Sequence, residues 1–516
     1  MATALPQYFN AATFFIDRHV AEGRGGHTAF RFGGVSITYG GVAAASARWA
    51  NALSALGVDI ENRVVIALPD VPEFAAAFWG AARLGAVAVP VNTLMSAAEY
   101  EFVLNDSRAK VAVVGESVAP AFAAIRARCP FLRAIVVLGG PVDGTVAFDA
   151  VVARASDRHE AARTFREDVV YWGYTSGSTG APKAAVHSHK DLVAAADLVG
   201  VGVFGIAEDD LVLSASKLYF AFGLGNTLCF PARVGAAAIL EPARLDAEGA
   251  FALIARERPT VFFAVATLYA RMLHVRDAER RFDLSSLRLC VTSGEALPPP
   301  VFDAWAERFG IELADVVGST EALHDFIATR PGKARRGSCG QVVPGFDARL
   351  VDDDGRDVPT GTVGHLLVRG ETTSPYYWNR LDRTRATMVG EWLRTGDMLA
   401  CDEEGYFYFA GRADDMIKVS GMWVSPAEVE GLLLQHPAVV EAGVVGYADA
   451  AGLVRPLAFV VVKDGVAPSP DLERALRAFV RERAAGYKVP AAVEFVLELP
   501  KTATGKIQRF RLRARP

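Results

Sequence analysis

The segment Tyr174 to Ala184, "YTSGSTGAPKA", gathers small hydroxyl side chains around glycines and ends beside a lysine. Glycines let backbone amides approach a phosphate closely, hydroxyl groups donate hydrogen bonds to its oxygens, and a lysine adds positive charge. The lysine neither directly follows a glycine nor precedes a Ser or Thr, so the segment departs from the P-loop pattern. A flexible surface turn is the alternative interpretation. The candidate phosphate-binding residues are Thr175, Ser176, Gly177, Ser178, Thr179, Gly180 and Lys183.

Four further motifs follow at long range and carry suitable chemistry. They are "VGSTE" (317–321), "TGD" (395–397), "GRADDMIKVSG" (411–421) and "PKTATGK" (500–506). A glutamate supplies the hard oxygen ligand that Mg²⁺ prefers, and an aspartate can accept hydrogen bonds from two neighbouring hydroxyl groups at once. In this order and spacing, the five motifs resemble the adenylate-forming superfamily of acyl-CoA synthetases, firefly luciferases and peptide-synthetase adenylation domains, over roughly residues 30–513.

The resemblance implies a reaction in two steps. A carboxylate attacks the α-phosphate of ATP to give an acyl-adenylate and pyrophosphate, and a thiol then displaces AMP. Because an anion must approach a polyanion, the site has to offset phosphate charge with magnesium, lysine and aligned dipoles.

Each motif residue takes a role by this resemblance. Lys506 would lie between the substrate carboxylate and the α-phosphate, and is one of three catalytic residues with Glu321 and Thr320. Glu321 and Thr179 would hold Mg²⁺, and Asp397 would accept hydrogen bonds from both ribose hydroxyls. The nucleotide-binding residues implied outside the phosphate loop are Gly294, Glu295, Ala296, Asp315, Asp397, Arg412, Lys418 and Gly421, and the first four of these would contact the adenine.

The C-terminal part is expected to move. The resemblance implies an N-terminal domain over residues 1–413, a C-terminal lid domain over residues 414–516 and a hinge at Asp414. Rotation would remove Lys506 and bring Lys418 and Gly421 to the site, where the glycine leaves room for the pantetheine arm of coenzyme A. A simple turn glycine is the alternative for Gly421.

The acyl pocket is predicted to be apolar. The segment "KLYFAFGLGN" (217–226) has aromatic residues where amino-acid-activating relatives carry an aspartate, and Gly318 stands where acetyl-CoA synthetases have tryptophan. An unpaired ammonium would be costly in such a pocket, whereas flat walls suit an aromatic ring and small substituents such as fluorine. The predicted lining residues are Tyr219, Phe220, Ala221, Phe222, Gly318, His324 and Ile327.

The closest resemblance is to the benzoate-CoA ligases, with free coenzyme A as the acceptor thiol because no carrier domain follows Lys506. Two departures are Val317, where many relatives have a tyrosine on the adenine, and His365, where a glutamate is common. Alternatives are a medium-chain fatty acyl-CoA synthetase, a hydroxybenzoate or aminobenzoate ligase, and a non-catalytic nucleotide sensor on the same fold.

Composition agrees with an enzyme that acts on small molecules. The 516 residues include 54 basic and 59 acidic side chains, with a net charge of −5, which argues against a nucleic-acid or membrane surface as partner. The five cysteines show no CxxC spacing, and the N-terminus lacks a signal-peptide pattern, so a cytoplasmic monomer or homodimer is expected.

The order of elements predicts an α/β fold. Short apolar strands alternate with helices over two series, near residues 63–114 and 211–318, which indicates two βα subdomains with parallel sheets. After about residue 335, Gly and Asp-Gly turns predict antiparallel hairpins in a small β-barrel-like subdomain. The last hundred residues predict a separate α+β domain, with a boundary near 411–415.

Overall fold

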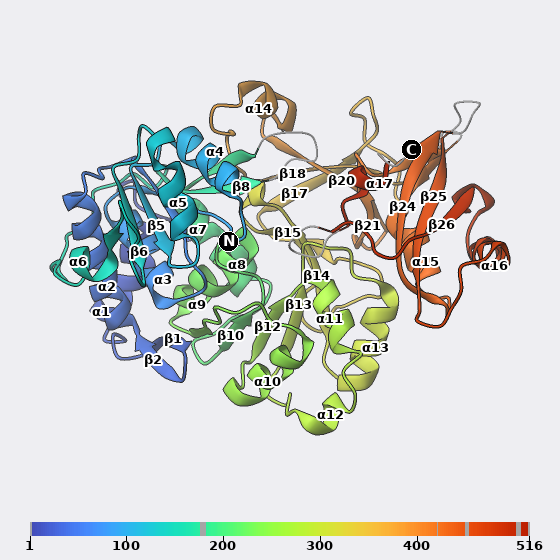
Figure 1. Ribbon diagram of the computed structural model, residues 1–516, viewed down its shortest axis with the longest axis horizontal. Coiled ribbons are helices and arrows are strands. Elements are labelled where there is room, and N and C mark those ends of the chain that lie inside the picture. Colours follow the sequence, from blue (N-terminus) through green and yellow to red (C-terminus); the bar gives the residue numbers. More distant parts are fainter. Residues whose placement is uncertain (1–2, 176–181, 420–421, 449–453, 502–506, 514–516) are drawn as a thin grey trace.

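The computed structural model describes residues 3–175, 182–419, 422–448, 454–501 and 507–513. Figure 1 shows two α/β units side by side, a small β unit above them, and a C-terminal unit at the right-hand side. This architecture confirms the predicted α/β fold with two βα subdomains, a small β subdomain and an α+β C-terminal part.

The first α/β unit is built on a seven-stranded sheet in the order β7-β6-β5-β3-β4-β8-β9. All neighbours are parallel except β8 and β9, which form an antiparallel pair. Central strands such as β5 are buried along their whole length, as expected where helices cover both faces. The strands are β3 (Arg63–Ala67), β4 (Val87–Pro90), β5 (Val111–Gly115), β6 (Ala134–Leu138), β7 (Val146–Ala147), β8 (Val169–Thr175) and β9 (Lys183–Ser188). The helices are α2 (Tyr39–Ala55), α3 (Pro72–Arg83), α4 (Ala97–Ser107), α5 (Ala119–Ile125), α6 (Phe148–Val151) and α7 (His189–Ala195).

The second α/β unit has a nine-stranded sheet in the order β16-β15-β14-β13-β12-β10-β11-β1-β2. Its centre is parallel, and the β1-β2 hairpin from the start of the chain closes one edge. The strands are β1 (Thr28–Phe32), β2 (Val35–Thr38), β10 (Leu211–Ser214), β11 (Ala237–Ile239), β12 (Val261–Ala264), β13 (Leu289–Thr292), β14 (Leu313–Gly318), β15 (Asp325–Ala328) and β16 (Gln341–Val342). The helices are α1 (Arg18–Ala21), α8 (Ala221–Leu224), α9 (Phe230–Val234), α10 (Ala247–Glu257), α11 (Ala266–Met272), α12 (Ala278–Arg281) and α13 (Pro299–Phe309).

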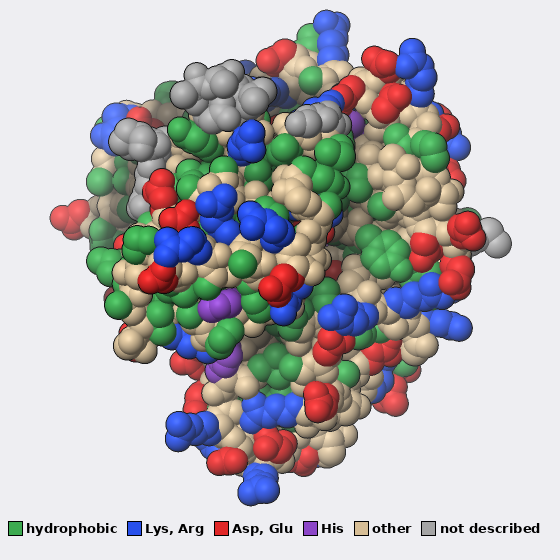
Figure 2. Space-filling model, turned by 90° about the vertical axis from the view of Figure 1, so that its right-hand side faces the viewer, with side chains coloured by type: hydrophobic (Ala, Val, Ile, Leu, Met, Phe, Trp, Pro, Cys, Tyr) green, Lys and Arg blue, Asp and Glu red, His purple; other side chains and the backbone are tan. Residues whose placement is uncertain are grey.

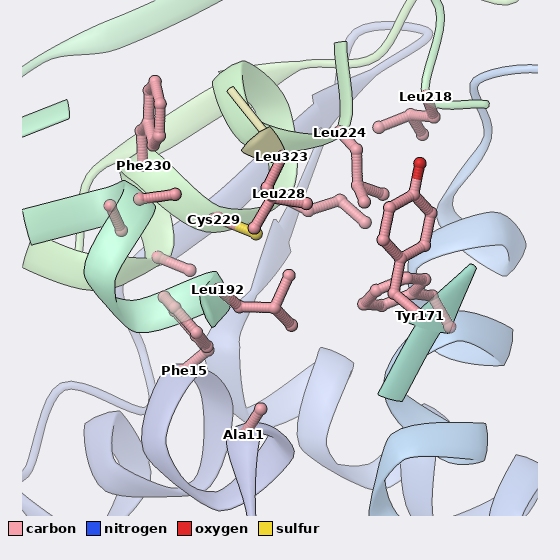
Figure 3. Packing of buried hydrophobic residues seen from close by; sticks show 14 of the residues in the cluster. Ala11, Phe15, Tyr171, Leu192, Leu218, Leu224, Leu228, Cys229, Phe230 and Leu323 are labelled. Carbon is pink, nitrogen blue, oxygen red and sulfur yellow. The ribbon is translucent and has the colours of Figure 1, made fainter. Parts of the chain in front are cut away.

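One hydrophobic core joins these two units. Tyr171 of β8, Leu192 of α7 and Phe230 of α9 belong to the same cluster of buried side chains (Figure 3). Because this core takes residues from both sheets, the two units are held against each other by apolar burial. A polar contact adds to it: the Leu218 amide donates to Asp70 Oδ1 at 3.0 Å, across the two units.

The remaining sheets are mostly antiparallel, as predicted for the chain after residue 335. The small β subdomain contains β17 (Phe346–Val351), β18 (Gly364–Gly370), β19 (Met388–Val389), β20 (Trp392–Cys401), β21 (Phe407–Arg412) and α14 (Leu381–Thr387). The C-terminal part contains β22 (Ile417–Val419), β23 (Met422–Val424), α15 (Pro426–Leu433), β24 (Val439–Ala448), β25 (Val454–Val462), α16 (Pro470–Arg481), β26 (Ala492–Phe495) and α17 (Arg509–Arg513). It has its own buried cluster, centred on β24 and β25.

The surface shows no strong separation of charge on the side occupied by the C-terminal part. Lys and Arg side chains alternate there with Asp and Glu side chains (Figure 2). None of the helices described in the structure is both long and apolar enough to cross a membrane.

We expect Gly80→Ala to lower stability, although alanine favours helices. A Cβ at Gly80 in α3 would lie 2.5 Å from Trp49 Cβ and 3.0 Å from the Ser46 carbonyl oxygen of α2. This overpacking should reduce the free energy of unfolding by about 1–3 kcal/mol. The urea midpoint of the transition followed by circular dichroism measures it.

The matched control is Gly431→Ala in α15, where a Cβ would meet nothing within 4 Å. That change should be neutral or stabilise by up to ~1 kcal/mol through helix propensity alone. Equal behaviour of the two variants would contradict the close packing of α2 on α3.

Candidate active site

The predicted phosphate loop connects two antiparallel strands. Thr175 ends β8 and Lys183 begins β9, and the two residues are opposite each other in the strand register. The residues predicted between them, Ser176, Gly177, Ser178, Thr179 and Gly180, lie outside the described residues, as do Gly421 and Lys506. The hairpin therefore fixes both ends of the loop at one edge of the seven-stranded sheet.

Lys183 lies in a three-residue group that the sequence did not predict as a unit. Its Nζ donates to the Tyr377 hydroxyl at 2.7 Å and lies 3.5 Å from Glu321 Oε1. The Tyr377 hydroxyl in turn donates to Glu321 Oε1 at 2.6 Å. The structure thus brings together Lys183 and Glu321, which are far apart in the sequence, and adds Tyr377 between them.

Burial dominates the electrostatics of this group. It lowers the pKa of Lys183, and the nearby Glu321 carboxylate opposes that shift. Burial followed by Glu321 raises the pKa of Tyr377, so its hydroxyl remains a donor. A phosphate placed here would meet a partly desolvated cation, whose attraction for an anion is stronger than in bulk water.

The turn that carries Thr320 and Glu321 is held from several sides. The backbone amide of Ser374 donates to the Glu321 carbonyl at 2.6 Å, and His187 Nε2 lies 2.7 Å from the Thr320 carbonyl oxygen. Leu323 follows with φ of 65°, an unusual value for a leucine, and its side chain points into the same buried cluster as Leu228 (Figure 3). Strained backbone of this kind persists where the surroundings fix it.

Asp397 and Arg412 form a second group on the neighbouring strands β20 and β21. Arg412 Nη1 donates to Asp397 Oδ1 at 2.7 Å and to the Thr395 carbonyl at 3.0 Å. Burial acts to lower the pKa of Arg412, but Asp397, and then Glu321, raise it above the usual value. Because Glu321 contributes to that shift and Arg412 contributes to that of Lys183, the two groups share one electrostatic field.

The predicted adenine-contacting residues lie after β13 and in β14. Gly294 and Ala296 are exposed, whereas the Glu295 carboxylate is turned toward α11, where Thr267 donates to it from its amide and hydroxyl. Asp315 is buried, and burial raises the pKa of its carboxyl well above the usual range, with a further contribution from Asp325. The adenine contacts stay a prediction for these four residues.

The predicted acyl-pocket residues separate into two groups. Phe222 lies 5.4 Å from His324 and 5.8 Å from Phe263, between ring centroids. Tyr219 and Phe220 pair with each other at 4.8 Å, and burial raises the pKa of Tyr219, with Asp70 adding to the shift. Ala221 and Ile327 are buried. The apolar wall around His324 therefore includes Phe222.

Gly318 is required by the β14-β15 hairpin itself. A Cβ there would lie 2.6 Å from both the His324 carbonyl oxygen and Asp325 Oδ1. The missing side chain thus permits close approach of β15, and Asp325 is brought beside a position predicted to line the acyl pocket.

The sequence of this chain matches proteins of a known family. The AMP-binding enzyme family matches residues 17–378, and the AMP-binding enzyme C-terminal domain matches residues 428–506. The chain belongs to the AMP-binding enzyme family. A benzoate-CoA ligase of Thauera aromatica is 44% identical, over 99% of this chain and 97% of its own length.

Two solved structures are also similar to this AMP-binding enzyme. An anthranilate CoA ligase in complex with anthranoyl-AMP has a TM-score of 0.94 and 43% identity, covering 99% of this chain and 98% of that one. A benzoate CoA ligase from Burkholderia xenovorans has a TM-score of 0.89 and 41% identity, covering 98% of this chain and 100% of that one.

Several residues in contact with the site were missed by sequence reasoning. Tyr377 lies in "TTSPYYWNR" (372–380), a polar and aromatic segment that carried no recognised motif. The same segment supplies Ser374, and His187 comes from β9, two strand positions after Ala185. Asp325 directly follows His324, yet it was not singled out, because a charged residue is unexpected in an apolar pocket.

We expect Tyr377→Phe in this AMP-binding enzyme to lower kcat/KM for ATP-pyrophosphate exchange by about 10- to 100-fold, since hydrogen bonds to two charged groups are lost. The ring is retained, so the unfolding midpoint should change little. Tyr376→Phe is the control, because that neighbouring side chain is 39% exposed. Equal exchange rates for the two variants would show that the hydroxyl has no role.

Proposed function

We propose that the protein is an AMP-forming benzoate-CoA ligase. In the first step, one benzoate oxygen bonds to the α-phosphorus of ATP and pyrophosphate leaves; in the second, the sulfur of coenzyme A bonds to the acyl carbon and AMP leaves. The observation that supports this most is the Lys183, Tyr377 and Glu321 group, placed one turn from the aromatic wall at His324. Full-length similarity to benzoate-CoA ligases supports the choice of acid.

The phosphate end of the site would bind ATP through charge. Lys183 would donate to the β- and γ-phosphates, while Asp397 and Arg412 would orient the ribose. Within the described part of the chain, no three His, Cys, Asp or Glu side chains are placed to hold a metal ion. Glu321 fits a site shared with the nucleotide: its Oε1 contacts Tyr377 and Lys183, and Oε2 would be the oxygen that binds the ion.

Magnesium, when held by Glu321, Thr179 and the phosphate oxygens, would neutralise charge on the leaving pyrophosphate. Thr320 would contact the α-phosphate, and the hydrogen bonds to its carbonyl and to that of Glu321 would keep both residues in place during the reaction.

Lys506 would complete the first step from the C-terminal domain, and Asp414 would be the hinge. The backbone amide of Ala413 donates to the Gly396 carbonyl of β20 at 2.8 Å, so residue 413 belongs with the small β subdomain. Asp415 pairs with Arg509 at 3.4 Å and Arg513 at 2.8 Å on α17, so residue 415 belongs with the C-terminal domain. Asp414 lies between these two anchored positions, which supports domains of 1–413 and 414–516.

The coenzyme A step would use the opposite end of the same domain. In this structure, Lys418 Nζ donates to Asp353 Oδ2 at 3.0 Å, and His365 Nε2 lies 3.0 Å from Asp353 Oδ1. His365, together with Lys418, lowers the pKa of Asp353. His365 thus contributes to a contact between the domains, which would break when Lys418 and Gly421 rotate toward the adenylate.

The cytoplasm is the proposed location, because the five cysteines are free and would stay reduced there. The proposed partners are benzoate, ATP and coenzyme A, with no nucleic-acid or membrane partner.

The choice of acid is tested by a comparison of benzoate and hexanoate. We expect AMP release with benzoate to exceed that with hexanoate by about 10-fold or more in kcat/KM, because flat aromatic walls pack better on a ring. A clear preference for hexanoate would identify a medium-chain synthetase. No AMP with any carboxylate would favour the nucleotide-sensor alternative.

The two-conformation mechanism is tested by separate half-reactions. Lys506→Ala should abolish pyrophosphate release from benzoate and ATP, yet convert supplied benzoyl-adenylate and coenzyme A to thioester. Gly421→Leu should form the adenylate and fail in thioester formation. Loss of both half-reactions to the same extent in both variants, with unchanged circular dichroism, would refute the domain rotation.

A further inference from the structure

A buried carboxyl group lies beside Gly318 and His324, two residues predicted to line the acyl pocket, and has no part in the mechanism above. Asp325 is the first residue of β15, and its side chain is 1% exposed. Its Oδ1 accepts a long hydrogen bond of 3.3 Å from Ser293 Oγ, whereas its Oδ2 accepts none from the residues that the structure describes. A buried polar atom without a hydrogen bond is costly, so such atoms usually have a partner when the site is filled.

The nearest polar neighbour of Asp325 is His324. Its Nδ1 lies 2.9 Å from Asp325 Oδ2, an ion pair only when the imidazole is protonated, and neither ring nitrogen makes a hydrogen bond with the described residues. The Thr292 hydroxyl and the Asn226 side-chain amide are also buried and make no hydrogen bond with the described residues. Thr292 precedes Ser293, and Asn226 follows Gly225, where a Cβ would lie 2.3 Å from His324 Cδ2.

The position of Asp325 in the sheet places it with the acyl pocket. Ser293 follows β13 and Gly318 ends β14, so the carboxyl group lies at the carboxyl ends of parallel strands, where ligands bind in open α/β sheets. Successive side chains of a strand point to opposite faces, so Asp325 shares a face with Ile327. Phe326 points the other way, toward Phe346 at 6.4 Å.

We propose that Asp325 Oδ2 accepts a hydrogen bond from an amino or hydroxyl substituent on the ring of the aromatic acid. The inference rests on the proposed function and narrows it: the preferred substrate is a benzoate that carries an N–H or O–H donor. Unsubstituted benzoate fits the same pocket but leaves the carboxyl oxygen unpaired. A site built around such a polar group rejects the analogue without the donor strongly.

Asp325 also changes the sequence argument about amino groups. The aromatic segment 217–226 lacks an acidic residue, which predicted a pocket in which an unpaired ammonium group would be costly. The structure supplies the carboxyl group from β15 instead, on a strand that pairs with the end of β14. A neutral aryl amine is a hydrogen-bond donor and needs no paired charge, so it would suit an acceptor such as Asp325.

The first experiment measures AMP release by the full-length protein with ATP, Mg²⁺ and coenzyme A. The panel contains benzoate, the isomeric aminobenzoates and hydroxybenzoates, and the fluoro- and methylbenzoates as analogues of similar size without a donor. We expect the kcat/KM of the best amino- or hydroxybenzoate to exceed that of benzoate by about 100-fold or more. Benzoate or a fluorobenzoate as the best substrate would overturn the inference while upholding the proposed function.

The second experiment compares Asp325→Leu with wild type on the same panel. We expect the ratio of kcat/KM for the donor-bearing acid to that for benzoate to fall by at least about 10-fold, since the acceptor is lost. A purely structural role would lower both values equally and leave the ratio unchanged, which would overturn the inference. Ser293→Ala is the matched control, because it removes the donor to Oδ1 only, and its ratio should stay near that of wild type.

Asp325→Asn covers the case in which leucine prevents folding. Asparagine keeps the shape and one oxygen acceptor, so the ratio of kcat/KM for the donor-bearing acid to that for benzoate should lie between those of wild type and an apolar variant. A folded Asn variant with the wild-type ratio and unchanged benzoate activity would count against a role for the carboxylate. Failure of every carboxylate to give AMP in wild type would instead reject the proposed function itself.

Discussion

The structure depends on one constraint: in the proposed reaction two anions, a carboxylate and the triphosphate of ATP, must meet where water does not solvate them. The contact of Lys183 with Tyr377 and Glu321 shows how the fold meets it, because a partly buried cation and a carboxylate are held at fixed separation by a hydroxyl group between them. Neither charge would have to reorganise on binding of the phosphates that we propose for this site, which is the condition for strong electrostatic stabilisation. The β8-β9 hairpin, the turn at Thr320 and the segment around Ser374 serve to keep these three side chains in register.

The same constraint explains why the site is assembled from so many elements. Glu321 comes from the end of the nine-stranded sheet, Lys183 from the edge of the seven-stranded sheet, and Tyr377 from the connection between β18 and α14. The shared core that contains Tyr171 and Phe230 holds the two sheets together, so the distance between the lysine and the glutamate is set by apolar packing well away from the charges. The Asp397 and Arg412 side chains, on the paired strands β20 and β21, extend the electrostatic field of Lys183 and Glu321.

The sequence predicted the parts that depend on local pattern. Alternating apolar strands and helices determine both α/β units, and Gly-rich turns after residue 335 determine the antiparallel subdomain, since these signals reside in neighbouring residues. The motif residues Lys183, Glu321, Asp397 and Arg412 could be proposed from the sequence because their types suit phosphate and ribose chemistry.

Contacts made only in three dimensions escaped prediction. Tyr377 has no motif of its own and becomes important because an isolated bridge between Ala185 and Tyr377 sets that segment beside β9. Asp325 follows a predicted pocket residue, yet its meaning depends on the hairpin that folds β15 against Gly318. The β1-β2 hairpin joins the second sheet for a similar reason, because strand partners distant in sequence leave no periodic signal.

The account depends most on the claim that the acid oxygen bonds directly to the α-phosphorus of ATP. The most direct measurement uses benzoate, or the preferred ring-substituted acid, labelled with ¹⁸O in its carboxylate, with ATP, Mg²⁺ and coenzyme A, and mass spectrometry of the products. The account predicts that one ¹⁸O atom appears in AMP for each thioester formed, with pyrophosphate unlabelled. Label in inorganic phosphate, accompanied by ADP, would show attack at the γ-phosphate and contradict it.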